Sequence, residues 1–424
     1  MTVPEDVEAV LATGEVCDSC LGRFFGKRSR GLSNEERGRA LRIARAIERH
    51  EPYVPYTGDC VVCSGLLGDL DIWADRVVAA LEGLEYATFL VGTRVPPLLA
   101  ECEEMVWSDL SLTHAEPLKS EMNREVGKRV SARTGREVDF AHPDVVVLLE
   151  IANGTVEVQR TPLFIYGRYR KFERGIPQTH WDCRSCHGAG CERCNFTGKQ
   201  YQDSVEELIA APITAALDAD GGVLHGSGRE DIDARMIGTG RPFILEVVAP
   251  RKRTLDLAAL ERAVNESAAG RVAVDLIRPA ARSEVETLKS SRSHKKYRIL
   301  VEVDGDISDD ALESALSALR GAVIHQRTPA RVAHRRADRV RDRTVLDIQY
   351  LGREEDGILI EVLGEAGLYI KELVSGDGGR TRPSLADAIG RPARVTRLDV
   401  VLVQDPTEEE DDGTPQRSTK EDTV

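Results

Sequence analysis

Sixteen residues, from Gly228 to Phe243, combine glycines, acids and arginines in the manner of an active-site loop. Glycine lets the backbone approach a ligand closely, and an arginine beside a carboxylate keeps that carboxylate ionised. Asp231 and Asp233 are separated by one residue, so either carboxylate could serve as a nucleophile. The composition alone also allows an acidic surface loop that is held by an Arg–Asp ion pair.

Eight of the nine cysteines form four Cys-x-x-Cys pairs, which is the spacing of zinc ligands. Two thiolates three positions apart on a tight turn reach the same face of a tetrahedral ion, and two such turns complete a shell of four. We therefore expect two closed, structural zinc sites; the alternative, disulfides, is disfavoured in a reducing cytosol. The first expected site consists of Cys17, Cys20, Cys60 and Cys63, and the second of Cys183, Cys186, Cys191 and Cys194.

The acidic charge is unevenly distributed along the 424 residues. The net charge is −14, but residues 161–404 hold 37 basic against 36 acidic side chains, so this part can present basic patches. Arginine supplies 46 of the 57 basic residues, and this preference together with the acidity suggests a high-salt cytosol and a halophilic source. The first residues are acidic and no apolar run is long enough to cross a membrane, so we expect a globular, cytoplasmic protein.

The hydrophobic pattern divides the chain into units that would position these residues. Residues 1–66 are expected to form the first zinc-binding unit, and residues 405–424 an acidic tail whose lack of apolar periodicity predicts disorder. Residues 67–160 alternate expected helices at 72–84 and 119–134 with expected strands at 86–91, 144–150 and 155–159. With Val91-Gly-Thr-Arg-Val95 at the first strand, this unit resembles a THUMP domain, an RNA-binding module of RNA-modifying enzymes.

Residues 161–404, which include the cysteine hairpin at 183–194, show a different pattern. Helices do not alternate regularly with strands here, so the predicted fold class is α+β with a central, mainly antiparallel sheet. Strands are expected at 243–248, 272–277, 297–303, 345–351 and 358–363, among helices at 204–216, 256–266 and 310–319.

Two stretches of this unit carry residue types that bind RNA. Between residues 166 and 174, aromatic side chains interleave with cations, which suits base stacking and phosphate contact; the alternative is a solvated strand edge. Between residues 326 and 343, arginines outnumber aspartates, which predicts a loop and short helix on RNA; the alternative is an exposed amphipathic helix. The predicted RNA contacts are Arg168, Arg170 and Lys171 in the first stretch, and Arg327, Arg331, Arg335 and Arg336 in the second.

Three segments resemble the motifs of one enzyme family. Gly228-Arg-Glu-Asp-Ile-Asp-Ala-Arg235 is similar to the catalytic motif of the tRNA pseudouridine-54/55 synthase family. His294-Lys-Lys-Tyr-Arg298 resembles the second motif, and Gly367-Leu-Tyr-Ile-Lys-Glu-Leu373 resembles the third. Residues 326–329 with 332–338 resemble the thumb-like RNA-contact segment of the family. The likeness covers most of the chain outside the acidic tail, and the cysteine hairpin at 183–194 resembles that of archaeal members.

The resemblance assigns the nucleophile and its surroundings. It implies that Asp231 attacks uridine, after which the base detaches, rotates and rejoins through carbon. Asp231 is favoured over Asp233 because it holds the aspartate position of the Gly-Arg-x-Asp pattern. Arg229 or Lys371 would keep this carboxylate ionised in a dry pocket.

The resemblance also implies the walls of the pocket and the substrate. Tyr297 would stack on the target uracil with its hydroxyl placed for proton transfer, and Tyr369 would line the opposite wall. The implied activity is that of a tRNA pseudouridine synthase, which acts on position 54, position 55 or both in the TΨC arm and contacts the acceptor stem. Neither an organic cofactor, a catalytic metal, a membrane nor an obligate protein partner is expected.

Other functions are weighed by the motifs that they need. A THUMP-containing methyltransferase would need a glycine-rich strand-to-helix turn, and the nearest, at 188–190, lies inside the cysteine hairpin. A nucleobase deaminase would need His-x-Glu before Pro-Cys-x-x-Cys, and the sequence contains neither half. A zinc-containing THUMP RNA-binding protein without catalysis stays open, because all features except Asp231, Tyr297 and Tyr369 would serve it equally.

Overall fold

The computed structural model describes residues 3–28, 30–334 and 336–404. The chain divides into two compact units: residues up to Thr161 with Arg251–Arg253, and Pro162–Pro250 with the chain from Thr254 onward. Each unit has its own hydrophobic core. Arg335 and the predicted acidic tail at 405–424 lie outside the described residues. Among the described helices, none is both long enough and apolar enough to span a bilayer.

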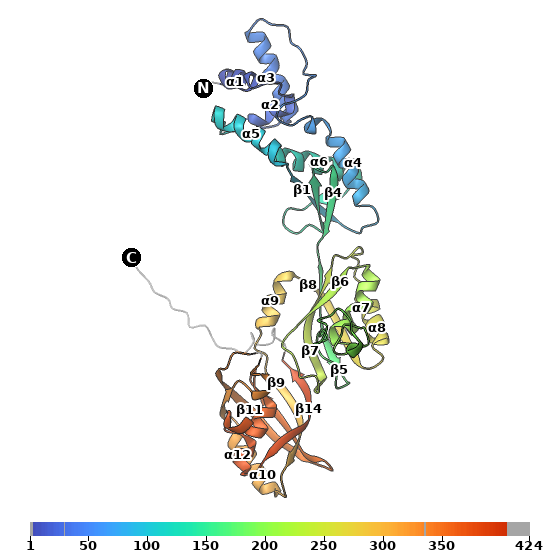
Figure 1. Cartoon of the computed structure of the whole chain (residues 1–424), viewed down its shortest axis with the longest axis vertical. Helices are drawn as coiled ribbons and strands as arrows, with labels where there is room; N and C mark the ends of the chain where they lie inside the picture. The colour runs from blue at the N-terminus through green and yellow to red at the C-terminus, as the bar shows by residue number, and fades with distance from the viewer. Residues whose placement is uncertain (1–2, 29, 335, 405–424) are drawn as a thin grey trace, which may run out of the picture. The chain divides into compact units, whose positions relative to one another are not determined.

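The first unit combines helices with a four-stranded sheet (Figure 1). Its elements are α1 (Val3–Ala12), α2 (Asp18–Phe24), α3 (Asn34–Glu48), η1 (Leu66–Gly68), α4 (Leu70–Ala80), β1 (Thr88–Arg94), α5 (Pro97–Leu110), α6 (Leu118–Thr134), β2 (Glu137–Val138), β3 (Val145–Glu150) and β4 (Thr155–Arg160). Strand β1 pairs in parallel with β2 and β3, and β3 pairs antiparallel with β4. Helix α6 contacts both α4 and β1, so it covers one face of the sheet.

A pair of glycines fixes the crossing of α2 and α3. A Cβ atom on Gly22 would lie 1.7 Å from the carbonyl oxygen of Asn34, and one on Gly38 would lie 1.8 Å from the carbonyl oxygen of Asp18. Because both clashes involve backbone, glycine is the residue that permits this close approach. The crossing holds the start of α2, where Cys17 serves as the N-cap residue.

One hydrophobic core runs through the first unit, from Val7 to Leu149. The predicted boundary between residues 66 and 67 falls inside this core. The structure has the helices and strands predicted for 67–160 within a few residues of the expected positions, but α5 was not predicted. Val106 of α5 is buried, and Leu99, Trp107 and Leu110 pack against the same core, so the helix has an apolar face that the sequence interpretation missed.

The second unit contains a ten-stranded sheet with helices packed on it (Figure 1). Its helical elements are η2 (Glu192–Cys194), α7 (Val205–Leu217), α8 (Leu257–Ser267), α9 (Arg282–Ser290), α10 (Asp309–Leu319), η3 (Ala330–Val332), α11 (Ile370–Ser375), η4 (Gly376–Gly379) and α12 (Leu385–Ile389). Its strands are β5 (Leu163–Lys171), β6 (Gly221–Gly226), β7 (Arg235–Val248), β8 (Val272–Ala280), β9 (Lys295–Val303), β10 (Val323–Arg327), β11 (Val340–Glu354), β12 (Gly357–Gly364), β13 (Thr381–Arg382) and β14 (Ala393–Val403).

The strand order of the large sheet is β13-β10-β11-β12-β9-β14-β7-β5-β8, with β6 also paired to β7. Its neighbouring strands pair antiparallel except β14 and β7, which run parallel where Asp399 lies opposite Arg235. Helices α7 and α8 pack near the β8 end of the sheet, and α10 packs on β11. The predicted α+β class with a mainly antiparallel sheet is confirmed.

Two stretches of the second unit differ from the predictions. The aromatic and cationic stretch forms β5, which lies inside the sheet between β7 and β8 rather than at a solvated edge. The arginine-rich stretch at 326–343 contains the predicted loop and short helix, the 3-10 turn η3, but strands that were not predicted lie at both of its ends. It consists of the end of β10, the short 3-10 turn η3 and the start of β11, and β10 and β11 pair with each other.

Candidate active site and cysteine clusters

A cavity of about 590 Å³ lies in the second unit beside the loop between β6 and β7. Asp231 and Arg229 line it from that loop, Tyr297 lines it from β9, and Tyr369 and Lys371 line it from the start of α11. These are the five residues that the three sequence motifs predict to be catalytic or substrate-binding. The fold therefore brings segments far apart in the sequence to one cavity, which the catalytic interpretation requires.

Hydrogen bonds fix the loop that carries Asp231 at both ends. Gly228 adopts φ +76°, a left-handed conformation that favours glycine, and its carbonyl accepts a hydrogen bond of 3.0 Å from Nε2 of Gln178. At the other end, Arg235 donates to both carboxylate oxygens of Asp399 on β14, over 2.9 and 2.6 Å. Arg174 donates to the same carboxylate over 2.5 Å. The loop is thus tied to the strand that joins the two halves of the sheet.

The two predicted tyrosines are held by their backbones. Tyr297 is the third residue of β9, which pairs with β12 on one side and β14 on the other. The backbone N–H of Tyr369 donates to Oε1 of the buried Gln326 over 2.8 Å, and Nε2 of Gln326 donates to the carbonyl of Tyr369 over 3.0 Å. Burial raises the pKa of Tyr297 to about 12, so its phenol is protonated at neutral pH.

Two cations contact Asp231. Nη1 of Arg331 lies 3.0 Å from Oδ1 of Asp231, and Nζ of Lys371 lies 3.4 Å from Oδ2. Lys371 also donates to both carboxylate oxygens of Asp233, over 2.9 and 2.7 Å. The side chain of Asp231 is 34% exposed, whereas that of Asp233 is 69% exposed. Asp231 is therefore the more enclosed of the two carboxylates.

The sequence motifs did not single out Arg331 as a partner of Asp231. We predicted it as an RNA contact, but the structure holds it against the Asp231 loop through Glu372, which is 5% exposed and accepts from Nε over 2.7 Å. Burial opposes the charged form of Arg331, but the hydrogen bond and charge of Glu372 outweigh it and raise the pKa of Arg331. Arg229, a predicted partner of Asp231, instead places its guanidinium 5.9 Å from the ring centroid of Trp181.

A buried network lies behind the loop. Glu230, next to Asp231, points inward and accepts from Nε of Arg241 over 2.9 Å and from the hydroxyl of Tyr169 at 2.9 and 3.0 Å from its two oxygens. The side chains of Glu230 and Arg241 are each 1% exposed. Burial opposes ionisation of Glu230, but the nearby Arg241 charge lowers the pKa of Glu230 below its ordinary value. The sequence prediction missed this network.

Lys171 belongs to this network, which corrects its prediction as an RNA contact. Its side chain is fully buried and lies 3.8 Å from Glu230. Its Nζ donates to the carbonyl of Ile176 over 2.8 Å and lies 3.4 Å from the carbonyl of Asp231. An ammonium enclosed in this way cannot reach a phosphate. The period of two along β5 could have revealed this, since Tyr169 and Lys171 share the buried face and Arg168 and Arg170 share the other.

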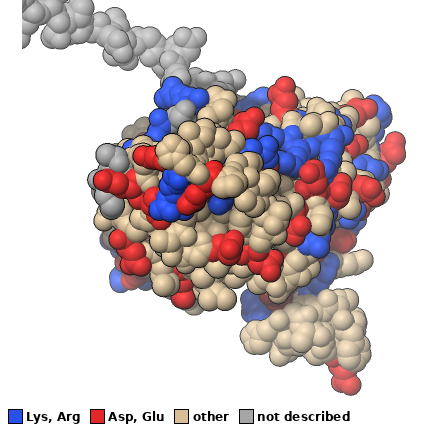
Figure 2. Space-filling model, turned by 90° about the horizontal axis from the view of Figure 1, so that it is seen from above, with Lys and Arg blue, Asp and Glu red and all other residues tan. Residues whose placement is uncertain are grey.

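The remaining predicted RNA contacts on described residues have partners within the protein. Arg168 donates to three backbone carbonyls, Arg170 pairs with Asp275, Arg327 pairs with Asp338, and Arg336 donates to the hydroxyl of Tyr369. Figure 2 shows basic side chains interspersed with acidic ones on the face in view. RNA contact by these arginines stays a prediction, and Arg335 lies outside the described residues.

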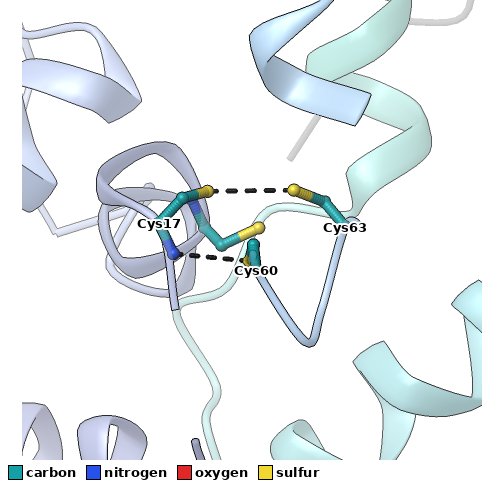
Figure 3. A group of neighbouring side chains, drawn as sticks. Cys17, Cys60 and Cys63 are labelled. Atoms are coloured by element: carbon teal, nitrogen blue, oxygen red, sulfur yellow. Dashed lines mark hydrogen bonds between the residues drawn. The ribbon is translucent and has the colours of Figure 1, made fainter. Parts of the chain in front are cut away.

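The first cysteine cluster brings together the four residues predicted in the first unit. Their sulfur atoms lie within 4.8 Å of one another, and three of the four residues are buried. Figure 3 shows the sulfurs of Cys17 and Cys63 facing each other, 3.8 Å apart. A tetrahedron with zinc–sulfur bonds of about 2.3 Å has sulfur–sulfur edges of about 3.8 Å. The arrangement thus fits the zinc site that the spacing predicted.

The second cluster has the same geometry in a different setting. Its sulfur–sulfur distances are 3.9 Å for Cys183–Cys191, 3.8 Å for Cys186–Cys194 and 3.7 Å for Cys191–Cys194. Backbone N–H groups donate to its sulfurs, among them that of Gly198 to Cys194 over 3.3 Å. Four sulfur ligands leave no open coordination position, so both clusters suit a structural ion rather than a catalytic one.

Comparison with known proteins identifies the family. The model of the Pus10 C-terminal region matches residues 164–404, and that of the archaeal Pus10 THUMP domain matches residues 73–150. The chain is 46% identical over 420 residues to the tRNA pseudouridine synthase Pus10 of Methanothrix thermoacetophila, covering 93% of each chain. It is 46% identical over 413 residues to the protein of the same name from Halorubrum lacusprofundi, covering 95% of this chain and 97% of the relative. The chain belongs to the Pus10 family.

Membership in the Pus10 family makes the chain a pseudouridine synthase and confirms the predicted THUMP domain. The C-terminal match lies in the second unit, which contains the cavity, and the THUMP match lies in the first. Among solved structures, a Cbf5-Nop10-Gar1 complex shows a weak likeness, with a TM-score of 0.31, 19% identity, and coverage of 47% of this chain and 45% of that one.

Proposed function

We propose that this Pus10-family chain converts uridine to pseudouridine in the TΨC arm of tRNA, at position 54, position 55 or both, with Asp231 as nucleophile. The observation that carries the proposal is the convergence of Asp231, Tyr297 and Tyr369 on one cavity. The substrate follows from the relatives, which are named tRNA pseudouridine synthases. A cytoplasmic location agrees with this substrate.

The reaction is an isomerisation, so it neither gains nor loses atoms. Asp231 attacks the nucleoside, the bond between N1 and C1′ breaks, and its electron pair stays on the uracil. The base then rotates, a bond forms between C5 and C1′, and the bond between the nucleoside and Asp231 breaks, which frees the carboxylate; C5 loses its proton and N1 gains one. No electrons enter or leave, so the proposal includes neither an organic cofactor nor a catalytic metal.

The contacts in the cavity suit these steps. Arg331 and Lys371 place two positive charges beside the carboxylate of Asp231, the group that attacks in this proposal. The ring of Tyr297 offers a platform for a uracil that has left its stack, a contact that contributes about 1 to 3 kcal/mol. Tyr369 lines the same cavity and is fixed by Gln326. These side chains thus supply positive charge beside the carboxylate, a ring on which the uracil stacks and a wall of the cavity.

The remaining parts of the chain support RNA binding in this proposal. The THUMP domain contacts the acceptor stem, and the arginines near η3 contact the TΨC arm. The two cysteine clusters hold structural zinc ions, because their sulfur–sulfur distances match a tetrahedral shell. No obligate protein partner is included.

An RNA-binding protein without catalysis is the alternative. It would use the THUMP domain, the clusters and the arginines equally well, but it has no need for a carboxylate that two cations contact inside a cavity. Incubation of the purified protein with an unmodified tRNA transcript, followed by mapping of pseudouridine at each position, separates the two functions. Product at 54 or 55 supports the enzyme; tRNA binding without product supports the alternative.

Metal analysis tests the clusters separately. We expect about two zinc ions per chain, one for each set of four thiolates. Replacement of Cys186 by serine should remove one ion, and Cys102→Ser, which changes a cysteine outside both clusters, should remove none. A content near zero in protein purified without chelator would contradict the zinc assignment.

A further inference from the structure

Lys295 lies on the same face of β9 as Tyr297, because side chains two residues apart on a strand point the same way. Both residues line the cavity, together with Asp231. The family resemblance and the proposed chemistry assign no role to this lysine. The position of Lys295 beside Tyr297, the proposed stacking surface for uracil, therefore requires an explanation.

The surroundings of Lys295 differ from those of an ordinary surface lysine. Its Nζ donates to the carbonyl of Ser293 over 2.9 Å, and no carboxylate lies within 4.0 Å of it in the part of the chain that the structure describes. Its stem passes beneath Gly228, since a Cβ on that glycine would lie 3.9 Å from Cε of Lys295. Burial, followed by repulsion from Arg241, lowers the pKa of Lys295 to about 8.

The surroundings of the neighbouring residue, Lys296, differ from those of Lys295. Lys296 points to the other face of β9 and forms an ion pair of 3.2 Å with Glu361. The charge of Arg241 near Lys295 is itself compensated by Glu230. Lys295 is thus a partly buried cation with no anionic side-chain partner among the described residues, and it lines the cavity in which the proposed function places the substrate base.

We propose that Lys295 is a further catalytic residue, whose ammonium donates a hydrogen bond to a uracil carbonyl oxygen and stabilises negative charge on the detached base. This inference rests on the proposed function. When the bond between N1 and C1′ breaks, the electron pair left on N1 is shared with the carbonyl oxygens O2 and O4. A fixed cation in an enclosed site stabilises such developing charge more than water does.

Replacement of Lys295 by glutamine tests the role, with Lys296→Gln as the matched control on the same strand. Loss of one such donor lowers kcat by about 100-fold or more. We expect this fall for K295Q, with little change in the KM for tRNA, and near-normal kcat for K296Q. Equal effects of the two substitutions, a normal kcat for K295Q, or an effect confined to KM would overturn the proposal.

The pH dependence gives a second readout. The charge that lowers the pKa of Lys295 is that of Arg241 from β7. The other charged and titratable groups that line the same cavity are Tyr297 from β9, Arg229, Glu230 and Asp231 from the loop, Arg331 from η3, Arg336, Arg341 and Arg343 from β11 and the segment before it, and Tyr369 and Lys371 at the start of α11. Because its pKa is lowered, the ammonium is present below about pH 8 and lost above it, so kcat/KM of the wild type should fall as the pH rises through 8.

Lys295→Arg should retain activity and should not show this alkaline fall, because arginine stays charged. An inactive K295R, or one with the wild-type pH profile, contradicts the inference. Thermal unfolding of each variant shows whether it is folded, and K295R decides the question if K295Q is not. A wild type that forms no pseudouridine would refute the proposed function itself, whereas an active wild type with an active K295Q refutes this inference alone.

Discussion

The inner and outer sides of the Asp231 loop both consist of ion pairs, yet they differ in enclosure. On the inner side, Glu230 and Arg241 are almost completely buried, and the hydroxyl of Tyr169 donates to Glu230. On the outer side, Asp231 and its partner Arg331 keep about a third of their side-chain surface exposed. If a buried ion pair loses one charge, the other charge is left without water or a partner. In a partly exposed pair, a side chain can leave its partner and contact a substrate instead. We therefore expect the inner side to determine the shape of the loop and the outer side to carry out the proposed chemistry.

The largest effect should come from the outer side. Asp231→Asn removes the proposed nucleophile, so we expect pseudouridine formation to fall by about 10⁴-fold, which corresponds to about 5 kcal/mol in the activation barrier. Stability should change by less than about 1 kcal/mol, because the side chain is partly exposed. Single-turnover kinetics and chemical denaturation measure the two quantities. Full activity in this variant would remove Asp231 from the mechanism.

The next effect should come from the inner side and should appear as lost stability. Glu230→Gln leaves Arg241 and Lys171 buried without a compensating anion, which should lower the free energy of unfolding by about 3 to 5 kcal/mol at pH 7. The control is Glu313→Gln, a substitution at an exposed glutamate on α10. Equal stability of the two variants in urea denaturation would contradict the distinction between the two sides.

The same residue predicts a pH dependence of stability. The pKa of Glu230 is lower in the folded chain than in the unfolded chain, so the unfolded state binds its proton more readily. The stabilisation is complete above the unfolded pKa of about 4.3 and is lost as the pH falls through the lower folded value. We expect E230Q to lose less stability than the wild type between pH 7 and pH 3. If the free energy of unfolding of the two proteins changes with pH in parallel, ionisation of Glu230 does not stabilise the fold in this way.

A smaller effect should follow from loss of a cation on the outer side. Arg331→Gln removes one charged hydrogen bond to Asp231, so we expect kcat to fall by about tenfold to a hundredfold. Arg394→Gln, which breaks an exposed pair with Glu302, is the control and should leave the rate unchanged. If the two variants show similar kinetics, Arg331 has no role in activating the carboxylate.

The smallest effect should come from Asp233, the alternative nucleophile. Its carboxylate is largely exposed and pairs with Lys371, so Asp233→Asn should change the rate by less than about fivefold. Pseudouridine mapping with D233N and D231N side by side makes the choice between the two acids. A loss of activity in D233N as large as that in D231N would overturn the assignment.

The sequence was sufficient for the features that depend on local spacing. The four Cys-x-x-Cys pairs predicted both clusters, and the three motifs predicted which residues line the cavity. It was not sufficient for features that depend on sheet pairing. The period of two along β5 puts Lys171 on the same face as Tyr169, but it does not show that β5 lies between two other strands, so Lys171 was predicted to be a surface cation. The contact of Arg331 with Asp231 joins segments a hundred residues apart, so no local pattern could predict it.

The position of β14 has a consequence for when the enzyme becomes active. This strand lies between β9 and β7, so it joins the half of the sheet that carries Tyr297 to the half that carries the Asp231 loop. It is also the last described strand along the chain. During translation the two halves cannot be joined in this way until residues 393–403 have left the ribosome. A nascent chain that stops short of β14 should therefore hold folded parts of the sheet without a working uridine pocket.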